Sequence, residues 1–333
     1  VSAPAFAQSN VQIYGVMDLG FTRLGSSEEA GAHAGLKNRT AIDSSQSATS
    51  RLGFRGTEDL GNGLKAFFQI ESQLSPDTTS QTSGDRQVFL GLEGGFGRVW
   101  LGRDFNPARA YWTSLDPFGA TGVGSNQNVI VQQNRFDNGA FYRSPSFGGL
   151  TVTAAYSQNI GGNEETRVKG DPKTDSKGWS LTPVYKNGPL MVGGSYERYS
   201  DADIKRWNLG GGYNFGVADV RLGYSQTKFD SLDEKTKSWM LAGEIPVSES
   251  GKILASYTQT KFDSAKAKQF AVGYLHSLSK RTAVYATYSK VSTNSDTDGF
   301  VGVNKGLNPS NIVTGPDQAA LTSGLAVGLR HNF

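Results

Sequence analysis

The 333-residue sequence predicts an all-β chain that forms a 16-stranded antiparallel transmembrane β-barrel. First, apolar and polar residues alternate with a period of two along most of the chain. Second, short turns alternate with longer polar loops, as they do in barrels that cross a membrane. Third, the mean hydropathy is −0.41, and no run of about 20 apolar residues exists that would form a membrane-spanning helix.

The first predicted strand shows the alternation from Val11 to Thr22. Its apolar face carries Val11, Ile13, Met17, Leu19 and Phe21, and its polar face carries Gln12, Asp18 and Thr22. The same pattern recurs in three later segments, namely Leu64–Glu71, Leu150–Ser157 and Ala218–Ser225. A strand with one apolar and one polar side fits a wall between lipid and water.

Two kinds of connection separate the predicted strands. The seven short turns are residues 59–63, 94–97, 147–149, 186–189, 214–216, 248–251 and 277–280. The eight loops are residues 25–39, 75–84, 105–134, 160–177, 200–204, 229–235, 263–266 and 291–320. Seven turns alternating with eight loops connect 16 strands, with short turns at one end of the barrel and loops at the other.

The last predicted strand is Leu325–Phe333. Leu325, Val327, Leu329, His331 and Phe333 share one face, and Ala326, Gly328, Arg330 and Asn332 share the other. A terminal aromatic residue on the apolar face fits the aromatic girdle of a membrane barrel. We expect this strand to pair with Val11–Thr22, because closure removes both exposed sheet edges.

Composition excludes several functions. The chain has no Cys, which rules out thiol chemistry and thiolate metal sites, and its net charge of +3 does not suggest a nucleic-acid partner. We expect no cofactor and no resident metal. Ala5-Phe6-Ala7 has the small-x-small pattern of a secretory cleavage site. Residues 1–7 are therefore predicted to be a signal-peptide remnant before a single domain at 8–333; a disordered Ala-rich leader is the alternative.

Enzymatic readings find little support. The three histidines, His33, His276 and His331, are scattered, so we expect no enzyme; an outer-membrane lipase with His276 as base is the alternative. Asp296-Thr297-Asp298-Gly299 resembles the start of a calcium loop but lacks the Glu at the twelfth position. A secreted all-β binding protein would share the alternation, but its outward residues would be polar.

Several motifs in order along the chain carry a family resemblance. They are Val11–Asp18, Ser50–Gly61, Arg86–Leu92, Leu101–Arg103 and the closing Phe333. At these segments the chain resembles the trimeric general porins of Gram-negative bacteria, most closely those of β-proteobacteria, from about Gln8 to the end. In such proteins the terminal aromatic is similar to the signal read by the outer-membrane insertion machinery.

The resemblance implies that the third external loop folds inward and narrows the lumen. Here that loop is residues 105–134, and at about 30 residues it is too long for an ordinary hairpin connection. By the family's motifs, Arg51, Arg86 and Arg135 match wall arginines, and Asp116 falls in the acidic part of the loop. Glu71 lies on the inward face of its own predicted strand and is placed to balance an arginine.

The resemblance also implies a function: an outer-membrane channel for passive diffusion of small hydrophilic solutes and ions. Three arginines against one or two acids predict a preference for anions. The family further implies a homotrimer, surrounded by outer-membrane lipid and lipopolysaccharide. A substrate-specific outer-membrane channel is the alternative; it would show an aromatic track along the lumen.

Overall fold

The computed structural model describes residues 10–26, 38–78, 86–119, 121–130, 132, 135–161, 177–200, 203–294 and 321–333. The predicted signal-peptide remnant at 1–7 lies outside this set, and so do His33 and the sequence Asp296–Gly299. Most of the predicted loops 160–177 and 291–320 also lie outside it.

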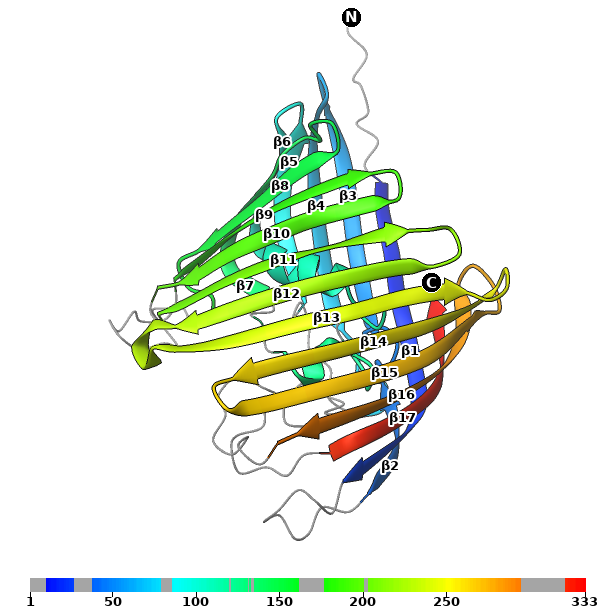
Figure 1. Ribbon diagram of the computed structural model, residues 1–333. Helices are drawn as coiled ribbons and strands as arrows, with labels where there is room; N and C mark the ends of the chain where they lie inside the picture. Colours follow the sequence, from blue (N-terminus) through cyan, green and yellow to red (C-terminus); the bar gives the residue numbers. More distant parts are fainter. Residues whose placement is uncertain are drawn as a thin grey trace, which may run out of the picture.

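The described chain folds into one closed antiparallel sheet (Figure 1). Its segments are β1 (Asn10–Ser26), β2 (Arg39–Ser44), β3 (Arg51–Gly61), β4 (Leu64–Gln73), β5 (Gln87–Gly94), β6 (Gly97–Phe105), β7 (Arg135–Arg143), β8 (Leu150–Ser157), β9 (Gly178–Asn187), β10 (Leu190–Tyr199), β11 (Ile204–Asn214), β12 (Asp219–Phe229), β13 (Glu234–Pro246), β14 (Gly251–Phe262), β15 (Ala265–Ser277), β16 (Thr282–Thr293) and β17 (Leu321–Asn332). Both β2 and β3 pair with β1, so they share one position in the wall. The 17 segments therefore make 16 barrel strands, as predicted.

The break between β2 and β3 is a feature that the alternation pattern does not predict. Residues 45–50 leave the ladder here, and Ser45 has a positive φ of 65°. β1 pairs with β2 through Leu19–Leu24 and with β3 through Asn10–Val16, which leaves Met17 and Asp18 facing the break.

The two terminal strands close the barrel as predicted. β17 pairs with β1 from Val16↔Asn332 to Ser26↔Leu321. The Gly15 and Phe333 backbones exchange hydrogen bonds of 3.0 and 3.1 Å. In β17, Leu325, Val327 and Leu329 are 39–49 % exposed on one face whereas Ala326 on the other is fully buried, which confirms the predicted faces.

The seven predicted short turns are confirmed. Each of the seven short turns joins two paired strands, for example Asn62 and Gly63 between β3 and β4, where both residues have positive φ angles. In Figure 1 the short turns gather at the upper and right rim, and the described connections β12–β13 and β14–β15 lie at the opposite, left rim. Two connections carry 3₁₀ turns, η1 (Asn126–Asn128) and η2 (Asp230–Leu232).

The two faces of the sheet differ in chemistry. The outward face carries exposed apolar side chains such as Ile13, Leu101, Leu209 and Leu222, each more than half exposed. Aromatic pairs also lie on this face, with ring centroids 5.0–5.3 Å apart: Trp179–Tyr196, Trp207–Tyr224 and Trp239–Tyr257. The other face buries Ser, Thr, Asn and charged residues, so it faces the lumen. Apolar outside and polar inside is the arrangement of a barrel in lipid.

One short helix interrupts the all-β architecture. This helix, α1 (Pro107–Ser114), lies within the segment between β6 and β7, and Figure 1 shows it behind β11–β13. Within the described residues, no helix has both the length and the apolar content needed to cross a membrane.

Candidate functional site

Asn106 determines where α1 begins and how its start is attached to the wall. Its Oδ1 accepts a hydrogen bond of 3.1 Å from the Ala108 N–H, which caps the helix. Its Nδ2 donates to Glu197 Oε2 at 2.6 Å and to the Tyr199 hydroxyl at 2.9 Å, both on β10. One side chain therefore ends β6, starts the helix and joins the segment to a strand 91 residues away.

The middle of α1 packs against a run of glycines on the lumen face of β10–β12. The Tyr111 hydroxyl donates to the carbonyls of Gly193 and Gly210, at 2.8 and 2.6 Å. A Cβ placed on Gly210 would lie 2.5 Å from Leu115 Cδ1, and one on Gly223 would lie 2.9 Å from the Trp112 ring. The glycines therefore provide the space that lets the helix contact the wall closely.

Beyond α1 the same segment reaches two other parts of the wall. Gln269 Nε2 on β15 donates to the Val123 carbonyl at 3.1 Å. The Thr121 hydroxyl donates to the Ser45 carbonyl at 2.7 Å, in the break between β2 and β3. Gly122 packs directly on the Gln46 backbone, where a Cβ would collide. The described part of residues 105–134 is thus attached to the lumen face at β10, β11, β15 and the β2–β3 break.

Asp116 organises the segment internally. Its Oδ1 accepts from the Phe118 N–H at 3.0 Å, and its Oδ2 accepts from the Asn126 N–H at 2.8 Å. Burial raises the pKa of Asp116 to about 7, although the two N–H donors and the charge of Arg109 oppose that shift. Burial also lowers the pKa of Arg109 to about 10, so Arg109 stays protonated near neutral pH. Asp116 is 4 % exposed, so its carboxylate faces the loop rather than water.

Three of the predicted residues meet on the opposite wall. Arg86 Nε lies 2.6 Å from Glu71 Oε1, and Arg51 Nε lies 3.4 Å from Glu71 Oε2. The Tyr14 hydroxyl donates to the same Glu71 Oε2 at 3.0 Å. A single buried carboxylate therefore holds two guanidinium groups, which leaves the cluster with a net positive charge.

Arg135 joins this cluster through an aromatic ring. Its Cζ lies 4.6 Å from the centroid of Phe105, and Arg86 Cζ lies 5.6 Å from the same centroid. Phe105 precedes the Asn106 cap, and Arg135 begins β7, so the two ends of the inserted segment lie beside the cluster. The structure thus brings together Arg51, Glu71, Arg86 and Arg135, whereas Asp116 lies within the loop.

The β2–β3 break is built around Asp18. Asp18 is fully buried, and its carboxylate accepts from the N–H groups of Gln46, Ser47 and Ala48 at 2.7–3.1 Å and from the Tyr285 hydroxyl at 2.6 Å. Two arginines donate hydrogen bonds to residues of this break. Arg51 Nη1 lies 3.0 Å from the Thr49 carbonyl oxygen, and Arg330 Nη1 lies 3.2 Å from Ser47 Oγ.

Sequence reasoning placed Asp18 and Arg330 on the polar face of their strands but gave neither of them a role at the site. The missing information was the register between β1, β3, β16 and β17, which no local pattern contains. Glu197 and its partner Arg206, whose Nη1 lies 3.7 Å from Glu197 Oε1, were also missed. Each follows or precedes an outward aromatic residue, Tyr196 or Trp207, and this alternation would have placed both side chains on the lumen face.

The two described histidines lie away from this cluster. His276 Nδ1 is 3.2 Å from the Tyr274 hydroxyl, and His331 Nδ1 is 2.9 Å from Thr282 Oγ1. Within the described ranges neither ring forms an ion pair with an acid, so neither is oriented as the base of a Ser-His-Asp set would be.

Comparison with known proteins gives consistent matches over the whole chain. The sequence model of the family described as Gram-negative porin matches residues 1–297. Outer membrane porin protein 32 of Delftia acidovorans is 34 % identical, with 100 % of this chain and 96 % of that protein aligned. An outer membrane porin protein of Bordetella pertussis is 30 % identical over 86 % of this chain and 90 % of its own length.

Solved structures show the same architecture. An anion-selective porin from Comamonas acidovorans has a TM-score of 0.79 and 30 % identity, covering 98 % of this chain and 100 % of its own. The trimer form of OmpT from Vibrio cholerae has a TM-score of 0.70 at 16 % identity, covering 98 % and 99 %, a likeness of fold.

Proposed function

This chain belongs to the family of Gram-negative porins, and from that premise we propose that its water-filled channel prefers anions. As an outer-membrane porin, the barrel lets small hydrophilic solutes diffuse passively across the membrane. Anion selectivity is named for the structural relative from Comamonas acidovorans and is proposed here for this chain.

The observation that carries the proposal is that the acids around the inserted segment are buried, whereas some of the lumen-side bases are exposed. Five acids around the inserted segment, Asp18, Glu71, Asp104, Asp116 and Glu197, are each at most 9 % exposed. Arg51, by contrast, keeps 29 % of its side chain exposed, and Arg143 and Lys186 are exposed further along the wall. Arg86, Arg109 and Arg206 are buried as well, so the cations that meet water in the lumen are Arg51, Arg143 and Lys186.

This arrangement has a direct electrostatic consequence. Fixed positive charge along a narrow low-dielectric passage raises the local concentration of anions and lowers that of cations. We propose that Arg51, Arg86 and Arg135 supply this field at the constriction and that Glu71 holds two of them in place. Asp116 shapes the loop opposite, and residues 105–134 narrow the lumen there.

The outer face supports a homotrimer. Among the described residues of β1–β6, the large apolar side chains exposed on the sheet are aliphatic or Phe, and exposed Tyr and Trp begin only at Tyr142. An aromatic girdle marks a lipid interface, so the part of the barrel without one is suited to contact another subunit. We propose that β7–β17 face lipid and that the long-loop rim meets lipopolysaccharide.

We further propose that the channel has no catalytic activity. Within the described chain, the side-chain hydrogen bonds of His276 and His331 go only to the hydroxyl groups of Tyr274 and Thr282. A purified sample is therefore expected to hydrolyse no ester substrate; measurable esterase activity lost on His276→Gln would contradict this.

The selectivity proposal is tested by the reversal potential of a planar bilayer in a KCl gradient. We expect the potential to correspond to anion preference, and the triple variant Arg51→Gln, Arg86→Gln, Arg135→Gln to reduce it. Arg281→Gln is the control, because Arg281 is an exposed arginine in the turn between β15 and β16, outside the cluster. Cation preference in the wild type would overturn the proposal, and an unchanged ratio in the triple variant would remove these residues from the constriction.

The trimer is tested by electrophoresis of unboiled samples. A trimer migrates as a high-mass band that collapses to the monomer position on heating. An Ile13→Lys, Leu101→Lys double variant on the β1–β6 face should abolish the high-mass band, whereas Leu209→Lys on β11 should leave it. Loss in both or in neither would contradict the assigned face.

A further inference from the structure

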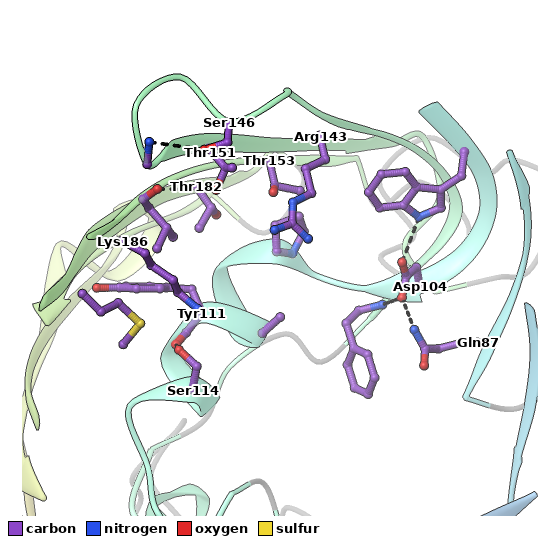
Figure 2. A pocket seen from close by; sticks show the side chains of 17 residues that line it. Gln87, Asp104, Tyr111, Ser114, Arg143, Ser146, Thr151, Thr153, Thr182 and Lys186 are labelled. Atoms are coloured by element: carbon purple, nitrogen blue, oxygen red, sulfur yellow. Dashed lines mark hydrogen bonds between the residues drawn. The ribbon is translucent and has the colours of Figure 1, made fainter. Parts of the chain in front are cut away.

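A recess of about 630 Å³ opens on the lumen side between α1 and the wall of β6–β9 (Figure 2). The helix contributes Pro107, Ala110, Tyr111 and Ser114, and the wall contributes residues of the six strands β5–β10 and of the β7–β8 turn. Because Ser146 and Gly149 of that turn line it, the recess lies toward the short-turn rim, which is periplasmic in such barrels. Arg51, Glu71, Arg86 and Arg135 do not line it, and Phe105 stands between the recess and that cluster.

Two cations in this recess lack the acid partners that other cations at this rim have. Arg221 is paired with Asp219 and Glu244 at 2.6 and 3.1 Å, and Arg98 with Glu93 at 2.9 Å. Arg143 on β7 and Lys186 on β9 form no ion pair with any residue that the structure describes. Figure 2 shows the side chains of both reaching into the recess.

Two hydroxyl groups beside Arg143 are also unused. Thr182 is only 3 % exposed, and its Oγ1 has no hydrogen-bond partner among the described residues. Thr153 likewise makes no side-chain hydrogen bond within that part of the chain, and both threonines line the recess. A buried hydroxyl without a partner is costly, so its persistence indicates a ligand or water that satisfies it.

Strand register places these groups in one row. Arg143 pairs with Thr153 across β7 and β8, and Thr153 pairs with Thr182 across β8 and β9. Neighbouring strands lie about 4.8 Å apart, so the row spans about 10 Å from a cation to two successive hydroxyls. Lys186 lies four residues beyond Thr182 on the same face of β9.

We propose that this row is a binding subsite for small polyhydroxylated organic anions, such as sugar acids or sugar phosphates. Arg143 binds the anionic group, Thr153 and Thr182 bind successive hydroxyls, and Lys186 adds positive charge at the far side. This subsite rests on the proposed anion preference. It adds which class of anion binds on the periplasmic side of the inserted segment. The Tyr111 hydroxyl is hydrogen-bonded to the carbonyls of Gly193 and Gly210. What Tyr111 offers a ligand in the recess is therefore the face of its ring.

The test is block of the chloride current through reconstituted channels by gluconate or glucose 6-phosphate. Butyrate is the anion without hydroxyls, and glucose is the polyol without charge. We expect gluconate or glucose 6-phosphate to block at concentrations about tenfold below butyrate and glucose. Block by only one of the two identifies the anionic group that is preferred. Equal block by all four solutes, or none, would overturn the subsite.

Variants assign the block to the row. Thr153→Val and Thr182→Val keep the side-chain shape and should each raise the half-blocking concentration about threefold to tenfold, the range for one hydrogen bond. Arg143→Gln should raise it further. Thr258→Val is the matched control, because Thr258 is a buried lumen-face threonine on β14 outside the recess. Values unchanged in the row variants would refute the assignment.

Two further measurements distinguish failure of the binding subsite from failure of the proposed anion preference. Quenching of Trp100, whose ring lines the recess, reports gluconate binding in detergent even where the current is too noisy to show block. The reversal potential in KCl is recorded on the same membranes. An anion preference without selective gluconate binding would reject the subsite alone, whereas a cation preference would reject the proposed selectivity.

Discussion

Replacing Asp18 with Asn removes one charge from the centre of the β2–β3 break and changes the size of the side chain very little. Asp18 Oδ1 accepts from the Gln46 N–H and the Tyr285 hydroxyl, and Oδ2 accepts from the N–H groups of Ser47 and Ala48. All four neighbours donate, and an amide NH₂ in place of either oxygen would face donors.

The cost follows from how the amide can turn. The better orientation places NH₂ toward Tyr285, whose hydroxyl can rotate to accept, and this leaves only the Gln46 N–H without a partner. One unsatisfied buried N–H costs about 1–3 kcal/mol, and the remaining bonds lose charge assistance worth about 1 kcal/mol each. We expect Asp18→Asn to lower the free energy of unfolding by about 3–5 kcal/mol.

The assay is urea unfolding in detergent micelles, followed by tryptophan fluorescence and by the heat-modifiable shift in electrophoresis. The matched control is Asp233→Asn, because Asp233 has a 91 % exposed side chain and a positive φ of 49° that Asn tolerates. The control should stay within about 0.5 kcal/mol of the wild type.

A double-mutant cycle with Tyr285→Phe checks the mechanism. If the Tyr285 hydroxyl bonds Asp18 as the structure shows, the two substitutions should be non-additive by about 1–2 kcal/mol. A cost below about 1 kcal/mol for Asp18→Asn, or strict additivity in the cycle, would refute the reasoning.

Two further predictions concern the segment between β6 and β7. Because burial raises the pKa of Asp116 to about 7, the carboxyl gains a proton as the pH falls from 8 to 6, and the lumen loses a negative charge. The anion-to-cation permeability ratio should rise over that interval. The rise should be smaller in Asp116→Asn, and an identical pH profile in the variant and the wild type would contradict this prediction. The raised pKa also means that the burial penalty is present above pH 7 and relieved below it, so the loop should be held more tightly at pH 6. Trp112→Ala removes a fully buried ring against Gly223, worth about 3–5 kcal/mol, and should loosen the loop and increase open-channel current noise. Noise unchanged from that of the control Ala110→Ser would count against this packing.

Sequence alone predicts the wall of the barrel because its determinants are local. The period of two from Val11 to Thr22 fixes which residues face lipid, and turn signals such as Asn62-Gly63 fix where each hairpin reverses. The faces of Leu325–Phe333 follow from the same rule, and the structure agrees with each of these expectations.

The tertiary structure decided which charges meet. Arg51, Arg86 and Glu71 come together because β3, β4 and β5 are neighbours in a defined register, and motifs of the family anticipated that group. The burial of Asp116 within its loop and the role of Asp18 in the β2–β3 break depend on contacts 10 to 267 residues apart in sequence. The row of Arg143, Thr153 and Thr182 likewise exists only through pairing across three strands. Alternation tells each strand which side is inward, but only closure of the barrel determines which inward residues become neighbours.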